Sequence, residues 1–244
     1  AADGGPSAGG SILFDGNVEG HYADRDSLRL DAVNGTAEVT GTVGANTPLL
    51  NLVLGCCGVD GDNNANPTPY FPGGNGGAVT FDGAVTADNI IDQRLSGSLT
   101  FNDKVTTGLF SEAQDNTATD GVVTALLGGA EFWGDLNFSR ASLTFGGTFT
   151  FDSSFTGSLD DAITLASDTV LDGTATGMDF DFKSGASFAT GIGAGQCTAG
   201  CSLTVLAGTN NITVESGASL SANDSPLTGV ILEAAQINLN NGGV

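Results

Sequence analysis

The sequence predicts an all-β protein with almost no helix, built as a β-solenoid or a β-sandwich-like stack of short strands. Three observations lead to this prediction. Short runs rich in Val, Ile, Thr and Phe alternate with polar residues along all 244 residues. The 38 Gly residues fall mainly between these runs, where Gly, Asn and Asp form corners. Finally, parts of the pattern repeat within the chain.

Composition excludes several functions. The chain has 28 acidic and 6 basic residues, a formal net charge of −22, so it has no basic face for nucleic acid or for an anionic membrane surface. No apolar run approaches the ~18 residues of a membrane span. High net charge favours disorder, but 40% of the residues are hydrophobic and 14 are Phe, which is enough apolar surface for a core.

The expected strands follow one another at the short spacing typical of all-β proteins. In chain order they cover residues 11–14, 37–43, 49–54, 78–81, 98–101, 142–145, 148–151, 162–165, 179–182, 202–206, 211–215 and 236–239. Only two short segments, 120–128 and 232–235, have a pattern that a helix could use.

The chain is expected to form a Gly-rich N-terminal arm at 1–10 followed by a single all-β domain at 11–244. A loop at 55–77 interrupts this domain and contains three of the six Pro residues. Because it is too long for an ordinary connection, we interpret it as a functional loop or a contact surface.

Two families of internal repeats favour a stack of rungs. Residues 27–54 align with residues 202–232, since both begin with Ser-Leu and pass through a Thr/Ser-Pro-Leu step into a final apolar run. A shorter unit, [LV]-T-F-x-[GD]-x-[VF]-T, occurs at 79–86, 99–108 and 143–151. In a solenoid, one side-chain parity of each rung packs on its equivalents in the next rung. The alternative is an antiparallel sandwich that uses similar strands.

These motifs resemble the tandem repeats of large secreted bacterial surface proteins, the filamentous-haemagglutinin-like and autotransporter-passenger β-solenoids. The resemblance covers the two ends of the chain and not residues 55–77 or 110–136. It implies an exported adhesin or structural fibre without enzymatic activity. The residues that carry it are Phe14-Asp15-Gly16, Ser27-Leu28, Thr47-Pro48-Leu49, Phe81-Asp82-Gly83, Ser202-Leu203-Thr204 and Ser225-Pro226-Leu227.

Four cysteines, Cys56, Cys57, Cys197 and Cys201, predict disulfides and therefore an oxidising, extracellular compartment. Three pairings are open. The two clusters can bridge each other, or each can close locally. A four-cysteine zinc site is disfavoured, because adjacent cysteines do not match the usual spacing of zinc ligands.

Two further kinds of site have weak patterns. Asp60, Asp62 and Asn64 resemble the start of a Ca²⁺ loop, but the match ends at Ala65, so an Asx-rich turn is the alternative. Ca²⁺ is the only cofactor that the sequence suggests. The glycosylation sequon N-x-[ST] occurs at Asn34, Asn137, Asn211 and Asn223. Because the chain is rich in Asn, Ser and Thr, several of these sequons are expected by chance.

No catalytic residues are expected, because the six basic residues are scattered and no nucleophile, phosphate or dinucleotide motif is present. The sequence therefore predicts a secreted structural protein, the subunit of a surface filament or sheath joined head to tail through its terminal β segments. Ile12, Leu13, Phe14, Ile237 and Leu239 are the expected assembly contacts.

Two other functions are weighed against this one. The first is an adhesin or carbohydrate-binding module that contacts glycans or a host cell surface through the 55–77 loop and Trp133. The second is a polysaccharide-degrading β-helix enzyme, which would need acidic residues beside Lys or Arg.

Overall fold

A computed structural model describes most of the chain and confirms the all-β class. The described part contains 19 strands and no helix. The expected arm at 1–10 lies outside it, as does the expected insertion at 55–77 except for Gly77. The described residues are 11–22, 25–30, 35–54, 77–92, 98–112, 123–133, 136–137, 142–151, 162–190, 197, 200–221 and 226–240.

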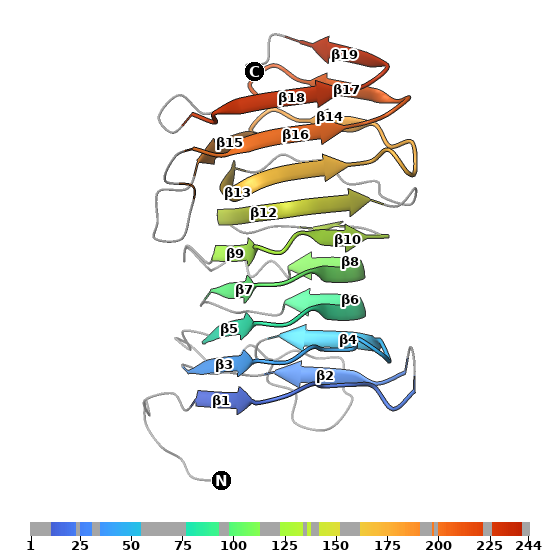
Figure 1. Ribbon diagram of the computed structural model, residues 1–244, viewed down its shortest axis with the longest axis vertical. Helices are drawn as coiled ribbons and strands as arrows, with labels where there is room; N and C mark the ends of the chain where they lie inside the picture. The colour runs from blue at the N-terminus through green and yellow to red at the C-terminus, as the bar shows by residue number, and fades with distance from the viewer. Residues whose placement is uncertain are drawn as a thin grey trace, which may run out of the picture.

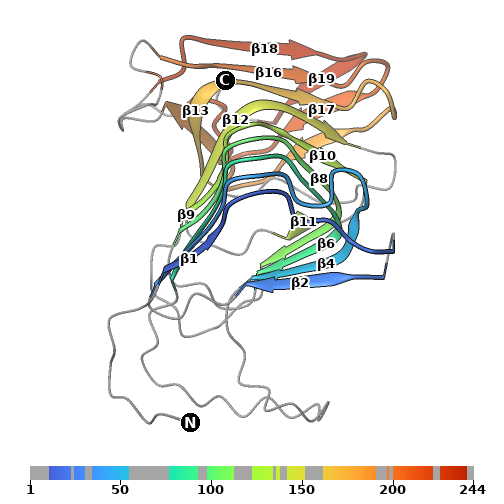
Figure 2. The same ribbon diagram turned by 60° about the horizontal axis from the view of Figure 1, so that its bottom comes forward.

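The strands stack in columns that form three faces (Figures 1 and 2). On the first face each strand pairs with the equivalent strand one rung along. This column consists of β1 (Ser11–Phe14), β3 (Thr36–Val39), β5 (Ala78–Phe81), β7 (Leu99–Phe101), β9 (Val123–Leu126), the first halves of β12 (Ser142–Phe151) and β13 (Ala162–Asp172), and β15 (Ser187–Thr190).

The second face follows each first-face strand across a corner. It runs from Val18 and Val43 through the first halves of β6 (Val85–Asp92) and β8 (Val105–Glu112), β10 (Ala130–Phe132), the second halves of β12 and β13, β16 (Ser202–Leu206) and β18 (Gly229–Glu233).

The third face completes the coil. One part of it consists of β2 (Ser27–Leu30), β4 (Leu49–Leu54), the second halves of β6 and β8, and β11 (Leu136–Asn137). The other part is a separate three-stranded sheet of β14 (Phe180–Phe182), β17 (Asn211–Val214) and β19 (Gln236–Leu239).

Every registered strand pairing in the described part is parallel. Consecutive rungs therefore run in the same direction around one axis, as a β-solenoid requires. The antiparallel sandwich is wrong, because hairpin connections would have made neighbouring strands antiparallel.

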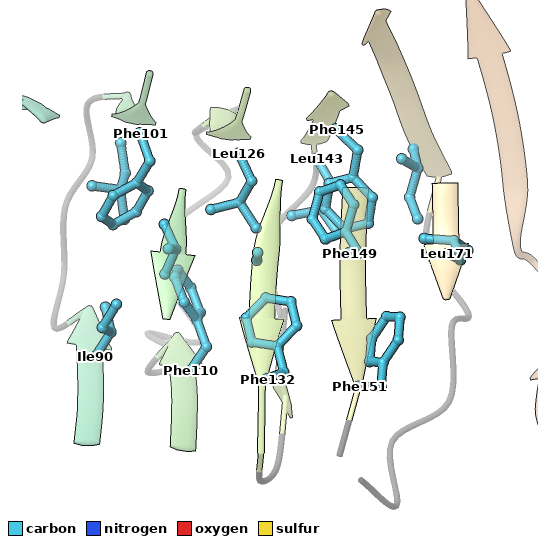
Figure 3. Packing of buried hydrophobic residues seen from close by; sticks show 14 of the residues in the cluster. Ile90, Phe101, Phe110, Leu126, Phe132, Leu143, Phe145, Phe149, Phe151 and Leu171 are labelled. Atoms are coloured by element: carbon cyan, nitrogen blue, oxygen red, sulfur yellow. The ribbon is translucent and has the colours of Figure 1, made fainter. Parts of the chain in front are cut away.

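The core consists of inward-facing columns of Phe, Leu, Ile and Val between the faces. In Figure 3, Phe101, Leu126 and Phe145 form one row and Ile90, Phe110 and Phe132 another. The first row matches the strand register. Phe81 and Phe101 stack with ring centroids 5.0 Å apart and an interplanar angle of 7°. The core is therefore one continuous cluster built from equivalent layers.

The short repeated unit is the corner between the first and second faces. Phe81 ends its first-face strand, and Val85 begins the second face after Asp82, Gly83 and Ala84. Residues 14–18, 39–43 and 126–130 occupy the same corner in other rungs, although their sequences are more degenerate. The three copies visible in the sequence are thus part of a longer series.

The structure corrects two sequence-based expectations. Residues 123–126 and 229–233, within or overlapping the two possible helices, are strands β9 and β18. Their parallel neighbours on the same face impose the extended conformation. The aligned repeats 27–54 and 202–232 also begin on different faces, since β2 is on the third face and β16 on the second. Their similarity reflects common rung chemistry and not equivalent positions.

Carboxylates connect one rung to the next. Asp168 Oδ1 accepts hydrogen bonds from Ser202 N and Ser202 Oγ, both at 2.8 Å. Glu19 Oε2 accepts from the backbone N–H groups of Asn46 at 3.0 Å and Thr47 at 3.1 Å. Asp179 Oδ1 accepts from Asn211 N at 2.7 Å. These acidic residues satisfy backbone donors at the starts of later segments.

This arrangement predicts acid sensitivity. The hydrogen bonds from the backbone and then the side chain of Ser202 lower the pKa of Asp168, so its carboxyl group has a lower pKa in the folded than in the unfolded chain. Its ionised form therefore stabilises the fold above the ordinary Asp pKa of about 3.9, and this contribution is lost as pH falls through the lower folded pKa. We expect the thermal midpoint, measured by circular dichroism, to fall as the pH drops below about 4.

Asp168→Asn is expected to weaken this acid-induced loss, because the amide keeps an acceptor oxygen but cannot be protonated in this range. Glu38→Gln removes the same formal charge on the exposed side of β3 and is the control. An acid-induced loss equally steep in Asp168→Asn and in the unmodified protein would contradict the assignment.

Candidate functional site at the ends of the solenoid

The two ends of the stack have unpaired strand edges. Among the described strands, β1 and β2 at one end and β18 and β19 at the other each pair on one side only. Figure 1 shows these strands at opposite ends of the long axis. An unpaired edge has free N–H and C=O groups that can pair with another strand.

At the N-terminal end, core positions are partly open to solvent. Ile12 and Phe14 are opposite Ala37 and Val39 in the register, and those two partners are buried. Ile12 and Phe14 are each 37% exposed. Both side chains are on the core side of β1 and continue the columns of their buried partners. They are exposed because no described rung covers them. Leu13, on the outward side of the same strand, is 61% exposed.

The C-terminal end repeats this feature. Ile237 and Leu239 of β19 are opposite Ile212 and Val214 of β17, which are fully buried. Ile237 is 42% exposed and Leu239 is 52% exposed. All five expected assembly contacts are thus among the exposed large hydrophobic residues of the end rungs.

The strands at the two ends carry few charges. Strand β19, Gln-Ile-Asn-Leu, has no charged residue, and β18 has one, Glu233. Strand β1 has none, and β2 has one, Arg29. At the N-terminal end, Glu19 has a lowered pKa. Its burial raises the pKa, but hydrogen bonds from Thr47 and Asn46 outweigh this effect. Asp26 has a pKa lowered by hydrogen bonds from the backbone N–H groups of Tyr22 and His21, which tie these two residues to the start of β2.

The predicted cysteine sites are partly described. Cys197 and Cys201 are at disulfide distance, with Cα atoms 5.5 Å apart. Of the pairings left open by the sequence, this cluster therefore has the local one. Cys201 is fully buried. Cys56 and Cys57 lie outside the described residues.

The remaining candidates give no assembled site. Asp60, Asp62 and Asn64 lie outside the described part, as do the sequon residues Asn34 and Asn223. Asn137 is opposite Ser111 in the β8–β11 register, and Asn211 is half-buried on β17. Within the described ranges, no group of three or more His, Cys, Asp or Glu residues could hold a metal ion.

The structure brings together charged residues that the sequence separates. Lys183 Nζ contacts Glu215 Oε1 at 2.9 Å and also pairs with Asp181. These two hydrogen bonds, the Asp181 bond first, raise the pKa of Lys183. Lys104 pairs with Glu131 at 2.7 Å. All five side chains are more than a third exposed, so these pairs contribute little to stability. The spacing of 32 residues between Lys183 and Glu215 hid this cluster from sequence reasoning.

Trp133, a candidate sugar contact, packs against the rung below. It is half-buried, and a Cβ atom added at Gly108 would lie 2.4 Å from its indole Nε1. The indole therefore covers Gly108 rather than standing clear of the surface.

Gly108→Ala should displace this ring. As Trp133 is the only tryptophan, its fluorescence reports the change directly, and we expect a red shift with a loss of about 1–3 kcal/mol in unfolding free energy. Gly229→Ala, where an added Cβ meets nothing within 4 Å, should leave the emission unchanged. An unchanged spectrum in Gly108→Ala would show that the ring does not occupy this position.

The described residues form no helix at all, and therefore none that could span a membrane. Comparisons of the chain with protein-family models, with curated proteins and with solved structures found no match.

Proposed function

We propose that this protein is an extracellular structural subunit that assembles head to tail into a surface filament or sheath. The exposure of core columns at both ends carries the proposal. Ile12 and Phe14 at one end, and Ile237 and Leu239 at the other, occupy positions that are buried in the neighbouring rungs. A second copy stacked on either end would bury them and pair the free strand edges.

The direction of the strands supports a translational contact. Because every described rung runs the same way around the axis, a copy added at the end meets parallel strands, the same arrangement that already joins rung to rung. Opposite ends of identical subunits then meet, which is a heterologous contact. Repetition of such a contact without closure gives an open filament.

The net charge of −22 opposes assembly at low ionic strength. Salt shortens the range of this repulsion, from a Debye length of roughly 30 Å at 0.01 M to roughly 3 Å at 1 M. We therefore expect filaments to form more readily in high salt or with Ca²⁺, which fits a salty extracellular setting.

Negative-stain electron microscopy and sedimentation velocity of the purified chain test the proposal across salt and Ca²⁺ concentrations. Filaments are expected, and Ile237→Asn with Leu239→Asn should prevent them by placing polar groups in the contact. Ile231→Asn is the matched control, since Ile231 is 57% exposed on the outward side of β18. A wild-type chain that remains monomeric under all these conditions would refute the proposal.

A further inference from the structure

We infer that the two ends join in one defined register, with Gln236 of one copy opposite Ser27 of the next. This inference rests on the end-to-end assembly proposed above and specifies its partner surfaces. The junction pairs β19 with β2 on the third face and extends the rung-on-rung interface that repeats inside each subunit.

The third face fixes the parity of this junction. Within the protein, Ile212 is opposite Ile237, and Leu28 is opposite Leu52, all on the core side of their strands. Placing Ile237 on Leu28 and Leu239 on Leu30 continues both columns. A slip by one residue would turn Arg29 toward the apolar column, at the cost of desolvating its charge.

The second face has a core column of its own that can continue across the junction. Its core column begins at Val18, which bridges to Val43, and ends at Leu232, which is opposite Val205. In the junction Leu232 covers Val18. On the first face, Ser219 bridges to Ser187 and would meet Ser11, which starts the equivalent column. Segments on all three faces can thus continue their parallel columns at once.

This register also brings two acidic residues together across the junction. Glu233 follows Leu232, and Glu19 follows Val18, so the two carboxylates are opposite each other across the junction. Like charges directly opposite on neighbouring strands oppose pairing. β19 brings no charge of its own, and Asn238 is opposite Arg29. Glu19 and Glu233 therefore account for part of the salt requirement of assembly.

Cysteine crosslinking tests the register. Neighbouring strands are about 4.8 Å apart, within the Cα separation of about 4.4–6.8 Å that a disulfide spans, so the double variant Ser27→Cys, Gln236→Cys should give a ladder of covalent oligomers on mild oxidation. Both side chains are exposed and face outward. The control Ser27→Cys, Asn238→Cys moves one partner by about 6.6 Å along its strand and should give no ladder. Each single variant controls for the native cysteines.

A second arm tests the charge pair. Glu233→Lys places a cation opposite Glu19 and should lower the salt concentration at which filaments form. Asp103→Lys makes the same charge change at an exposed corner between β7 and β8, in the middle of the stack, and is the control. Filaments with a ladder only from the shifted pair, or from neither pair, would overturn the register and leave end-to-end assembly intact. The absence of filaments from the wild-type chain would overturn the assembly itself and this inference with it.

Discussion

Gly83→Ala should lower the free energy of unfolding by about 3 kcal/mol or more, one of the two largest effects that we expect from a single substitution. A Cβ atom at this position would lie 2.6 Å from the carbonyl oxygen of Gly41 and 2.9 Å from Thr42 N in the preceding rung. Both are backbone atoms, so no side-chain rotation relieves the overlap. The two rungs would have to separate at the corner, which breaks adjacent hydrogen bonds.

Gly41 shows that the need for glycine is shared by the same corner in another rung. Its added Cβ would lie 2.3 Å from the carbonyl carbon of Gly16. Gly83 and Gly41 are needed for close approach of the backbones, because neither has a positive φ.

Gly229→Ala is the matched control for Gly83→Ala. An added Cβ there meets nothing within 4 Å, and the substitution should raise stability by about 0.4–1 kcal/mol by reducing the freedom of the unfolded chain. Urea titration followed by circular dichroism measures both variants. Equal stabilities of the two variants would mean that the rungs do not approach each other at the corner as closely as the structure shows.

The sequence indicated the local chemistry of the fold well. The alternation of apolar and polar residues predicted most strands, and the [LV]-T-F-x-[GD]-x-[VF]-T unit marked three of the corners. Those features are local, since a strand needs only its own parity and a corner only its own small residues. The degenerate copies at 39–43 and 126–130 became recognisable only through strand register.

The features that could not be predicted from the sequence depend on residues far apart in the chain. Alternation is the same in parallel and antiparallel strands, so the choice between solenoid and sandwich required the pairing itself. Asp168 accepts hydrogen bonds from Ser202, 34 residues away, and no local pattern marks it as different from an acid in a solvated turn. The Asp181–Lys183–Glu215 cluster was hidden for the same reason.

The candidate site lies between these cases. The terminal strands were recognisable, and Ile12, Leu13, Phe14, Ile237 and Leu239 are exposed as the assembly model needs. The register proposed for the junction was not predictable from the sequence. It is argued from core columns on three faces, and these columns become visible only when the strand pairings are known.

Phe101→Ala should lower the free energy of unfolding by about 3–5 kcal/mol. Phe101 is fully buried in the middle of the stack, with its ring 5.0 Å from that of Phe81 and 6.1 Å from that of Phe110. Truncation would leave a cavity between two rungs whose backbones are fixed by parallel hydrogen bonding on both sides, so the core cannot collapse around it.

Phe14→Ala gives the comparison, because Phe14 occupies the same column. The register runs from Phe14 through Val39 and Phe81 to Phe101. Phe14 is at the open end and already 37% exposed, so its truncation should cost no more than about 2 kcal/mol in the monomer. Urea titrations at low salt measure this difference. At the salt concentrations that favour assembly, Phe14→Ala should impair filament formation far more than it impairs folding. A monomer equally destabilised by both substitutions would contradict the open end, because Phe14 would then have to be as well covered as Phe101.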